Sequence, residues 1–162
     1  MTTTSHAPPN ASTRSSSHAG IIGKGSRVPT SAGPGPDLMT SATLEGNTVL
    51  SSDGHDVGTI KEIMLDVRSG RVAYAVLSSG GFLGVGDELR AIPWSALTLD
   101  TDRKCFLIGV RAERVKAAPS FDKQHWPLMA DASWSAGVHQ YYETEPYWTI
   151  GASGDTGPGA PL

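Results

Sequence analysis

Cysteine is almost absent from this sequence, since Cys105 is the single one among 162 residues. One thiol cannot close a disulfide within the chain, so a disulfide-stapled fold is excluded and a reducing compartment is favoured. The sequence also has no apolar run near the roughly 20 residues that a membrane-spanning helix requires. It has no apolar signal-peptide core near its N-terminus either. We therefore expect a cytoplasmic location.

Acidic residues are missing from the first 36 positions, where Arg14, Lys24 and Arg27 are the charged residues. With these three cations set apart, the formal net charge of −3 leaves −6 on the rest of the chain. A surface with this excess of acids repels phosphate groups. The charge therefore disfavours nucleic acid as a partner of the folded part.

Large apolar side chains are rare at both ends of the chain. Residues 1–37 consist mainly of Ser, Thr, Ala, Gly and Pro, and residues 151–162 have a similar composition. Such segments cannot bury enough apolar surface to offset the entropy that is lost on ordering. We predict that both ends are disordered and that the folded part begins near Leu44.

The most regular stretch is 57–77, in which two runs rich in Val, Ile, Leu and Tyr are joined at 68–70. β-branched and aromatic residues favour strands, and the Ser-Gly pair between the runs favours a short hairpin turn. The second run is apolar on both faces, so we expect both faces to be covered. Because Ala73 and Ala75 make one face small, we expect it to be the outer face, beneath another part of the chain.

The first run of this hairpin has an interrupted alternation. Ile63, Leu65 and Val67 share one face, whereas Ile60 is out of step with them. A slip of one residue near Lys61-Glu62 would bring all four side chains into phase. We predict a β-bulge at this point, which also bends the strand.

Other strands and one helix complete a predicted domain over residues 44–118. The ranges 47–51, 88–94, 97–99 and 104–110 are rich in strand-forming residues, and 111–118 has the composition of a short helix. Pro93 has no amide hydrogen to donate, so it must lie at a strand end or at a sheet edge. We therefore predict an all-β domain with short helices after it.

Aromatic residues are concentrated after this domain. Seven of the eleven in the chain lie within 28 residues: Phe121, Trp126, Trp134, Tyr141, Tyr142, Tyr147 and Trp148. Asp131 is a suitable N-cap for a helix that runs to about Tyr142, with Trp134, Val138 and Tyr141 on one face. Aromatic rings at this density are buried or mark an interface. We expect residues 119–150 to pack on the same chain or on a partner, and the sequence leaves both open.

Residue patterns with a known chemistry are also lacking. The polar run from Asp53 to Asp56 does not have the alternating acids of a calcium loop, and no second metal ligand accompanies His55, His125 or His139 at a useful spacing. No serine lies in a nucleophile elbow. The sequence therefore predicts no catalytic residue, no metal site and no cofactor.

Several short motifs in the same order resemble the PRC-barrel family. They are Asn47-x-Val49, Ser52-x-Gly54, Val57-Gly58-x-Ile60, Asp66-x-x-x-Gly70-Arg71-x-x-Tyr74, Gly80-Gly81-Phe82-x-Gly84 and Ile92-Pro93-Trp94. The family includes the cytoplasmic domain of the photosynthetic reaction-centre H subunit and the C-terminal domain of the ribosome maturation factor. The chain is most similar to the free-standing bacterial members.

The resemblance implies a small, strongly bent β-barrel of about six strands that serves as a docking surface rather than as an active site. We therefore predict a non-catalytic module that binds a protein partner or self-associates. Two alternatives stay open, an RNA-processing or ribosome-associated accessory factor and an enzyme whose site cannot be read from the sequence. The candidate interaction surface consists of eight aromatic residues: Phe82, Trp94, Trp126, Trp134, Tyr141, Tyr142, Tyr147 and Trp148.

Overall fold

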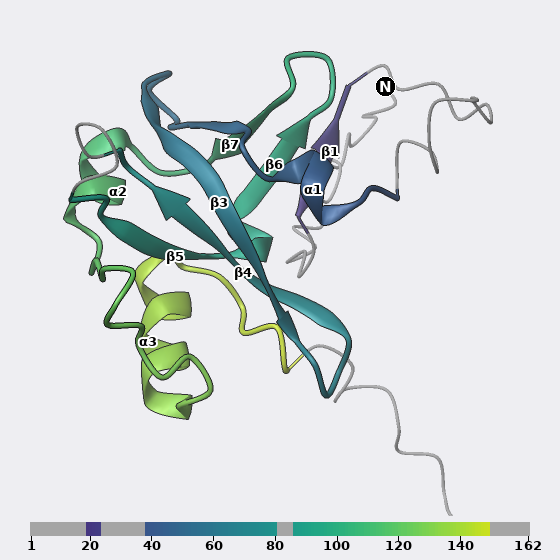
Figure 1. Cartoon of the computed structure of the whole chain (residues 1–162). Coiled ribbons are helices and arrows are strands. Elements are labelled where there is room, and N and C mark those ends of the chain that lie inside the picture. Colours follow the sequence, from purple (N-terminus) through teal and green to yellow (C-terminus); the bar gives the residue numbers. More distant parts are fainter. Residues whose placement is uncertain (1–18, 24–37, 81–85, 150–162) are drawn as a thin grey trace, which may run out of the picture.

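The computed structural model describes residues 19–23, 38–80 and 86–149 (Figure 1). Seven strands form one strongly curled sheet in the order β1-β6-β7-β2-β3-β4-β5, which confirms the predicted all-β fold. The strands are β1 (Gly20–Ile22), β2 (Thr48–Leu50), β3 (Asp56–Asp66), β4 (Arg71–Ser78), β5 (Leu89–Pro93), β6 (Leu97–Asp100) and β7 (Cys105–Ile108). The helices are α1 (Ser41–Leu44), the 3-10 helix η2 (Trp94–Ala96), α2 (Ala112–Ala117) and α3 (Ala132–Tyr141).

The long hairpin β3–β4 runs across the molecule (Figure 1). Its register shifts between Ile60 and Glu62, as the interrupted alternation predicted, and again between Met64 and Leu65. The turn is closed by the Asp66 carboxylate, which accepts hydrogen bonds from the turn amides and from the Ser69 hydroxyl. Two bulges in one strand bend it strongly, and this bend lets the sheet curl.

Gly58 is required where β3 crosses close to the end of β4. It has a φ of +135°, and a Cβ at this position would overlap the carbonyl oxygen of Ser78. A side chain is therefore excluded both by the backbone conformation and by the space. This is the physical reason for the glycine in the Val57-Gly58 motif.

The main core lies inside the curled sheet. Its strand residues include Val49, Ile60, Leu77, Ile92 and Phe106, together with Ala75. A second, smaller cluster is formed by Ala73, Tyr74 and Ala91, against which Trp134 and Tyr147 pack.

The predicted assignment of faces on β4 was wrong for Ala75. This residue is opposite Ile92 and belongs to the main core, whereas the large Tyr74 belongs to the cluster that meets the C-terminal aromatic residues. The main core also contains large side chains such as Ile92, Phe106 and Tyr142, so small and large residues share the inner side of the sheet. Composition alone had suggested that the small face was the outer one.

Strand β1 was not predicted, because residues 20–22 lie in the segment that was expected to be disordered. It pairs in parallel with β6 at the edge of the sheet, with Ile21 opposite Leu99. In the structure, backbone pairing with β6 orders residues 20–22. The other residues predicted to be disordered, in 1–37 and 151–162, lie largely outside the described part of the chain.

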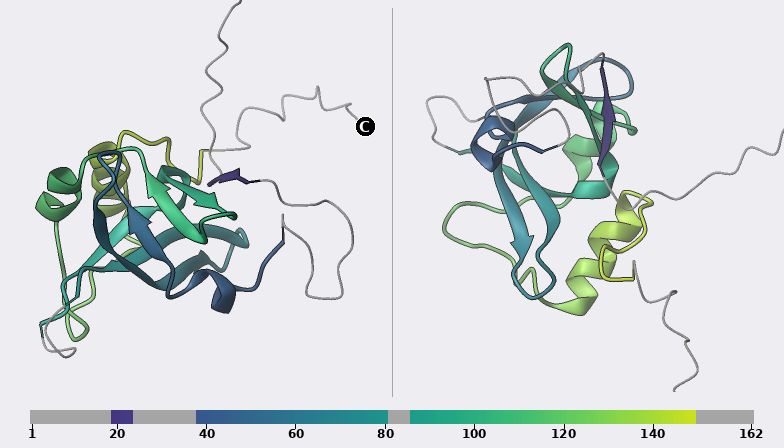
Figure 2. Two further views of the ribbon diagram at one scale, coloured as in Figure 1. Left: turned by 90° about the horizontal axis from the view of Figure 1, so that it is seen from above. Right: turned by 90° about the vertical axis from the view of Figure 1, so that its right-hand side faces the viewer.

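The helices α2 and α3 lie on one side of the molecule and β1 lies on the other (Figure 2). Helix α2 agrees with its prediction, since Val115 is fully buried against the main core. Helix α3 begins as predicted after Asp131, whose carboxylate accepts a hydrogen bond from the Trp134 amide at 2.9 Å. Its most buried face is displaced by one residue from the predicted one and consists of Ser135, His139 and Tyr142.

Candidate functional site

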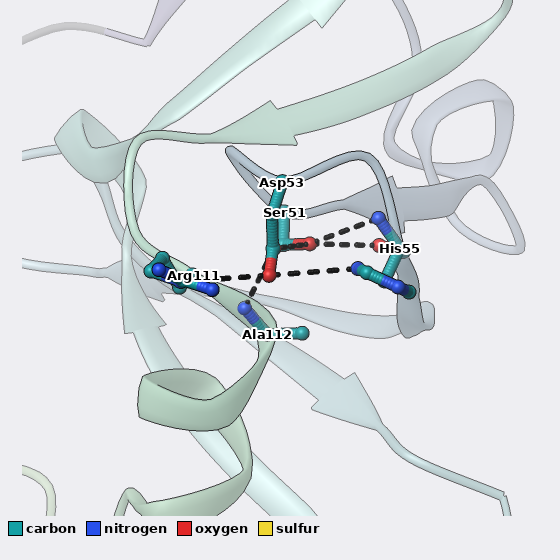
Figure 3. Close-up of polar contacts among 5 residues, drawn as sticks. All are labelled: Ser51, Asp53, His55, Arg111 and Ala112. Atoms are coloured by element: carbon teal, nitrogen blue, oxygen red, sulfur yellow. Dashed lines mark hydrogen bonds and ion pairs between the residues drawn. The ribbon is translucent and has the colours of Figure 1, made fainter.

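A polar cluster lies where the turn after β2 meets the start of α2 (Figure 3). Ser51 Oγ donates to Asp53 Oδ1 at 2.6 Å, and the Ala112 amide donates to the same oxygen at 3.0 Å. His55 Nδ1 and Arg111 Nε lie 3.5 and 3.7 Å from Asp53 Oδ2. The hydrogen bonds from Ser51 and Ala112 hold the pKa of Asp53 well below its ordinary value.

This cluster contains Ser, Asp and His, but it lacks the geometry of a nucleophilic triad. In a triad the imidazole takes the serine proton, whereas here the Ser51 hydroxyl donates to the carboxylate and accepts from the His55 amide at 3.1 Å. The His55 side chain is mostly exposed. Arg111, the N-cap residue of α2, makes no side-chain hydrogen bond to the first turn of the helix. The Asp53 carboxylate accepts the hydrogen bond from the Ala112 amide in its place, so the cluster caps the helix and has a structural role.

Arg90 is a buried cation that sequence reasoning missed. It lies on β5, is only 4% exposed, and donates to the carbonyl oxygens of Lys116 at 2.9 Å and Ala118 at 3.3 Å. It also donates to Ser79 Oγ at 2.9 Å and to Glu88 Oε2 at 2.6 Å. The guanidinium thus satisfies carbonyl groups at the end of α2 and fixes this helix to the sheet.

The second cluster has Tyr74 at its centre. The Tyr74 ring meets Trp134 and Tyr147 edge to face, with centroids 5.5 and 5.8 Å apart, and His139 at 5.6 Å. Trp148 contacts His139 and Tyr147 from the outer side, at 5.3 and 5.1 Å. These are preferred geometries for aromatic pairs, so α3 and the segment after it are bound to β4 within this chain.

His139 is a buried titratable group of this cluster. It is 1% exposed, and its Nδ1 lies 3.0 Å from Thr144 Oγ1. Burial lowers the pKa of His139 from 6.5 to about 4. The imidazole is therefore neutral in the folded protein at neutral pH.

We predict that acid weakens the fold through His139. The unfolded chain takes up the proton near pH 6.5, so the free energy of unfolding is at its full value above this pH and falls as the pH drops from 6.5 to about 4. The loss should total about 2–3 kcal/mol. Melting temperatures between pH 7.5 and 4.5 measure it. The variant His139→Leu should lose most of this dependence, and an equal dependence in both proteins would contradict the assignment.

A groove lies beside the tip of the β3–β4 hairpin, with a volume of about 580 Å³. We call it the hairpin-tip groove. It is lined by Met64, Leu65, Asp66, Val67, Arg68, Ala73, Tyr74, Met129, Ala130 and Tyr147. At its rim, Leu65 is 60% exposed and Val67 is 91% exposed. Of the three residues predicted to share one face, Ile63 packs against the main core, whereas Leu65 and Val67, nearer the hairpin tip, are exposed to solvent.

A second groove of about 320 Å³ lies between α3, β5 and the segment after α2. Its walls are mostly apolar and include Phe121, Trp134, Val138 and Tyr141. Phe121 forms a bridge with Leu89 through two backbone hydrogen bonds of 2.9 Å. The segment that follows the sheet is therefore joined to β5 at this edge.

The aromatic residues of the candidate surface have different environments. Trp126 and Trp148 are the more exposed ones, whereas Tyr142 is buried in the main core. Trp94 lies apart from the C-terminal aromatic residues and meets Phe106 edge to face at 5.8 Å. Phe82 lies outside the described residues. The structure therefore brings together Trp134, Tyr147 and Trp148, around Tyr74 and His139.

Tyr141 occupies the edge of α3, next to α2. Its hydroxyl donates to the Arg114 carbonyl at 2.8 Å, and the Arg114 guanidinium lies 5.3 Å from the centre of its ring. Arg114 also forms an ion pair of 3.0 Å with Glu143. Tyr141 thus links the two helices.

In the described ranges, no set of three or more His, Cys, Asp or Glu residues is arranged so that it could hold a metal ion. None of the helices in the same ranges has the length and hydrophobicity that spanning a membrane would require. The surfaces described above are therefore two apolar grooves and a structural polar cluster.

The fold and these surfaces define a small, strongly curled β domain with an aromatic extension packed on its outer side. Residues 36–115 match the model of one family, the PRC-barrel domain. The chain therefore contains a PRC-barrel domain, as the motifs predicted. No curated protein matches the sequence.

Proposed function

We propose that this PRC-barrel protein is a non-catalytic binding and assembly module whose docking surface is the hairpin-tip groove. PRC-barrel domains are of a kind that binds other proteins and is generally not catalytic. The observation that carries the proposal is the position of two exposed apolar side chains, Leu65 and Val67, at the rim of this groove. Exposed apolar residues beside a hollow surface are typical of interfaces between proteins.

The first partner to test is a second copy of the chain. Val67 projects from the hairpin, and the groove beside it is lined by Met64, Met129 and Tyr147. One surface thus carries both a projection and a hollow, which suits a two-fold interface in which each copy inserts its hairpin into the other. Methionine side chains adapt easily to an inserted group.

The charges around α2 support a protein-binding module over the RNA-related alternative. Arg111 lies within 3.7 Å of Asp53, and Arg114 forms its ion pair with Glu143. Phosphate binding requires cations that are grouped and available. Here both arginine side chains are paired with acidic residues, so they are less available to a phosphate group.

We predict that Val67→Glu abolishes self-association without unfolding the protein. Val67 is almost fully exposed, so the substitution should leave the melting temperature close to that of the wild type. A buried carboxylate at the interface is unfavourable, and the dissociation constant should rise at least tenfold. Light scattering during size-exclusion chromatography over a range of concentrations measures both proteins.

The control is Leu38→Glu, which places the same charge at another exposed apolar residue, outside the groove. It should associate like the wild type. Equal association of the Val67→Glu variant would contradict the assignment of the groove. A wild-type chain that stays monomeric and purifies without any other protein would contradict the proposed function itself.

A further inference from the structure

Strand β1 differs from the other strands in how it is attached. It has three residues and, among the described strands, pairs with β6 alone, with Gly20, Ile21 and Ile22 opposite Thr98, Leu99 and Asp100. The carbonyl oxygen of Ile22 accepts hydrogen bonds from the Thr101 amide at 2.9 Å and from the Thr101 hydroxyl at 3.2 Å. Strand addition of this kind derives its affinity from main-chain hydrogen bonds.

The contact is selective at the two glycines that flank the isoleucine pair. A Cβ on Gly20 would lie 2.9 Å from Thr98 Oγ1, and a Cβ on Gly23 would overlap Thr101 Oγ1. Gly23 also has a φ of +138°, which other residues rarely adopt. The edge of β6 therefore accepts a segment with glycine at both of these positions.

The segment is held by few interactions. Ile21 and Ile22 are 49% and 47% exposed, so each side chain keeps about half of its surface in water. A strand of three residues with half-buried side chains gains little packing to offset the entropy of ordering it. The edge of β6 should therefore open readily to a competing segment.

We propose that the outer edge of β6, over Leu97–Asp100 and Thr101, is a binding site for extended peptides of the pattern Gly-apolar-apolar-Gly, and that residues 20–23 are a ligand held by the same chain. The site adds the peptide as a parallel strand. Strand β1 lies at the end of the strand order opposite β5 and on the other side of the molecule from α3 (Figures 1 and 2). No residue of β6 lines the hairpin-tip groove, so the two sites are separate. This proposal does not depend on the proposed function.

The test uses the full chain with Gly23→Ala, which prevents its own segment from binding. The control is Gly109→Ala, because a Cβ at Gly109 meets no atom within 4 Å. Hydrogen exchange of the Thr101 amide should be at least tenfold faster in Gly23→Ala and unchanged in Gly109→Ala. The Ser52 amide, which donates to the Val110 carbonyl and not to β1, should exchange equally in all three proteins.

A fluorescent peptide with the sequence of residues 17–25 provides the second measurement. It should bind Gly23→Ala at least tenfold more tightly than the wild type or Gly109→Ala, as measured by anisotropy. The same peptide with alanine in place of Gly23 should bind none of them. In the wild-type chain, excess unlabelled peptide should shift the amide resonances of residues 97–101. Unchanged exchange at Thr101 in Gly23→Ala, or peptide binding no tighter than to the wild type, would overturn the proposal.

Discussion

Replacement of Arg90 by leucine is expected to lower the free energy of unfolding by about 3–5 kcal/mol. The guanidinium is buried and donates to the carbonyl oxygens of Lys116 and Ala118, to Ser79 and to Glu88. Leucine cannot donate, so the buried carbonyl groups at the end of α2 would lose their partners. For a domain of this size the melting temperature should fall by roughly 15 °C or more.

Two further variants isolate the cause. Arg90→Lys keeps the charge but not the planar fork, so it should recover only part of the lost stability. Arg103→Leu removes an exposed arginine of the β6–β7 turn and should change the free energy of unfolding by less than about 0.5 kcal/mol. Chemical unfolding curves of the three variants provide the comparison. If Arg90→Leu were as stable as Arg103→Leu, the hydrogen bonds from Arg90 to α2 would not contribute to the free energy of unfolding.

A chain that ends after Ala118 is expected to lose most of its stability. It lacks Trp134, Tyr142 and Tyr147, whose rings pack on the main core and on Tyr74. A buried aromatic side chain removes about 150–250 Å² from water, so at about 25 cal/mol per Å² three fully buried rings would contribute about 11–19 kcal/mol before the entropic cost of ordering the segment. Calorimetry should show a melting temperature lower by at least about 15 °C, or no cooperative transition.

The matched control is a chain that ends after Ile150, which removes only the terminal segment predicted to be disordered. Its melting temperature should stay within about 2 °C of the full-length value. An unchanged melting temperature after the cut at Ala118, together with lost self-association, would assign the aromatic residues to an interface between chains. The packing of Trp134 on Tyr74 would then not stabilise the single chain.

Local features of the fold could be predicted from the sequence because neighbouring residues determine them. The bulge near Lys61 was visible as a break in alternation, and the helix start at Asp131 was visible as a capping residue. The family motifs depend on similar local needs, such as the glycine at position 58. These features require no knowledge of what lies across the sheet.

The remaining features depend on contacts between distant parts of the chain. Nothing near Arg90 indicates that carbonyl groups 26 and 28 residues later will surround it. The burial of His139 results from the approach of Tyr74, and strand β1 exists because the edge of β6 is open to it. Hydrophobic periodicity along one segment cannot show any of these, and the exposed rim of the hairpin-tip groove became apparent only with the bends in β3.

Strand β2 has a consequence for how the protein folds. It is three residues long, yet it pairs with β3 on one side and with β7 on the other. The strands β3, β4 and β5 pair in sequence order, and so do β6 and β7, so each group can form from nearby residues. In the described part of the sheet, the groups are joined by the pairing of β2 with β7, Val49 with Phe106 and Leu50 with Leu107, which closes a loop of most of the domain. Because long loops close at a large entropic cost, this short strand makes sheet closure a late and slow event, after both groups have formed.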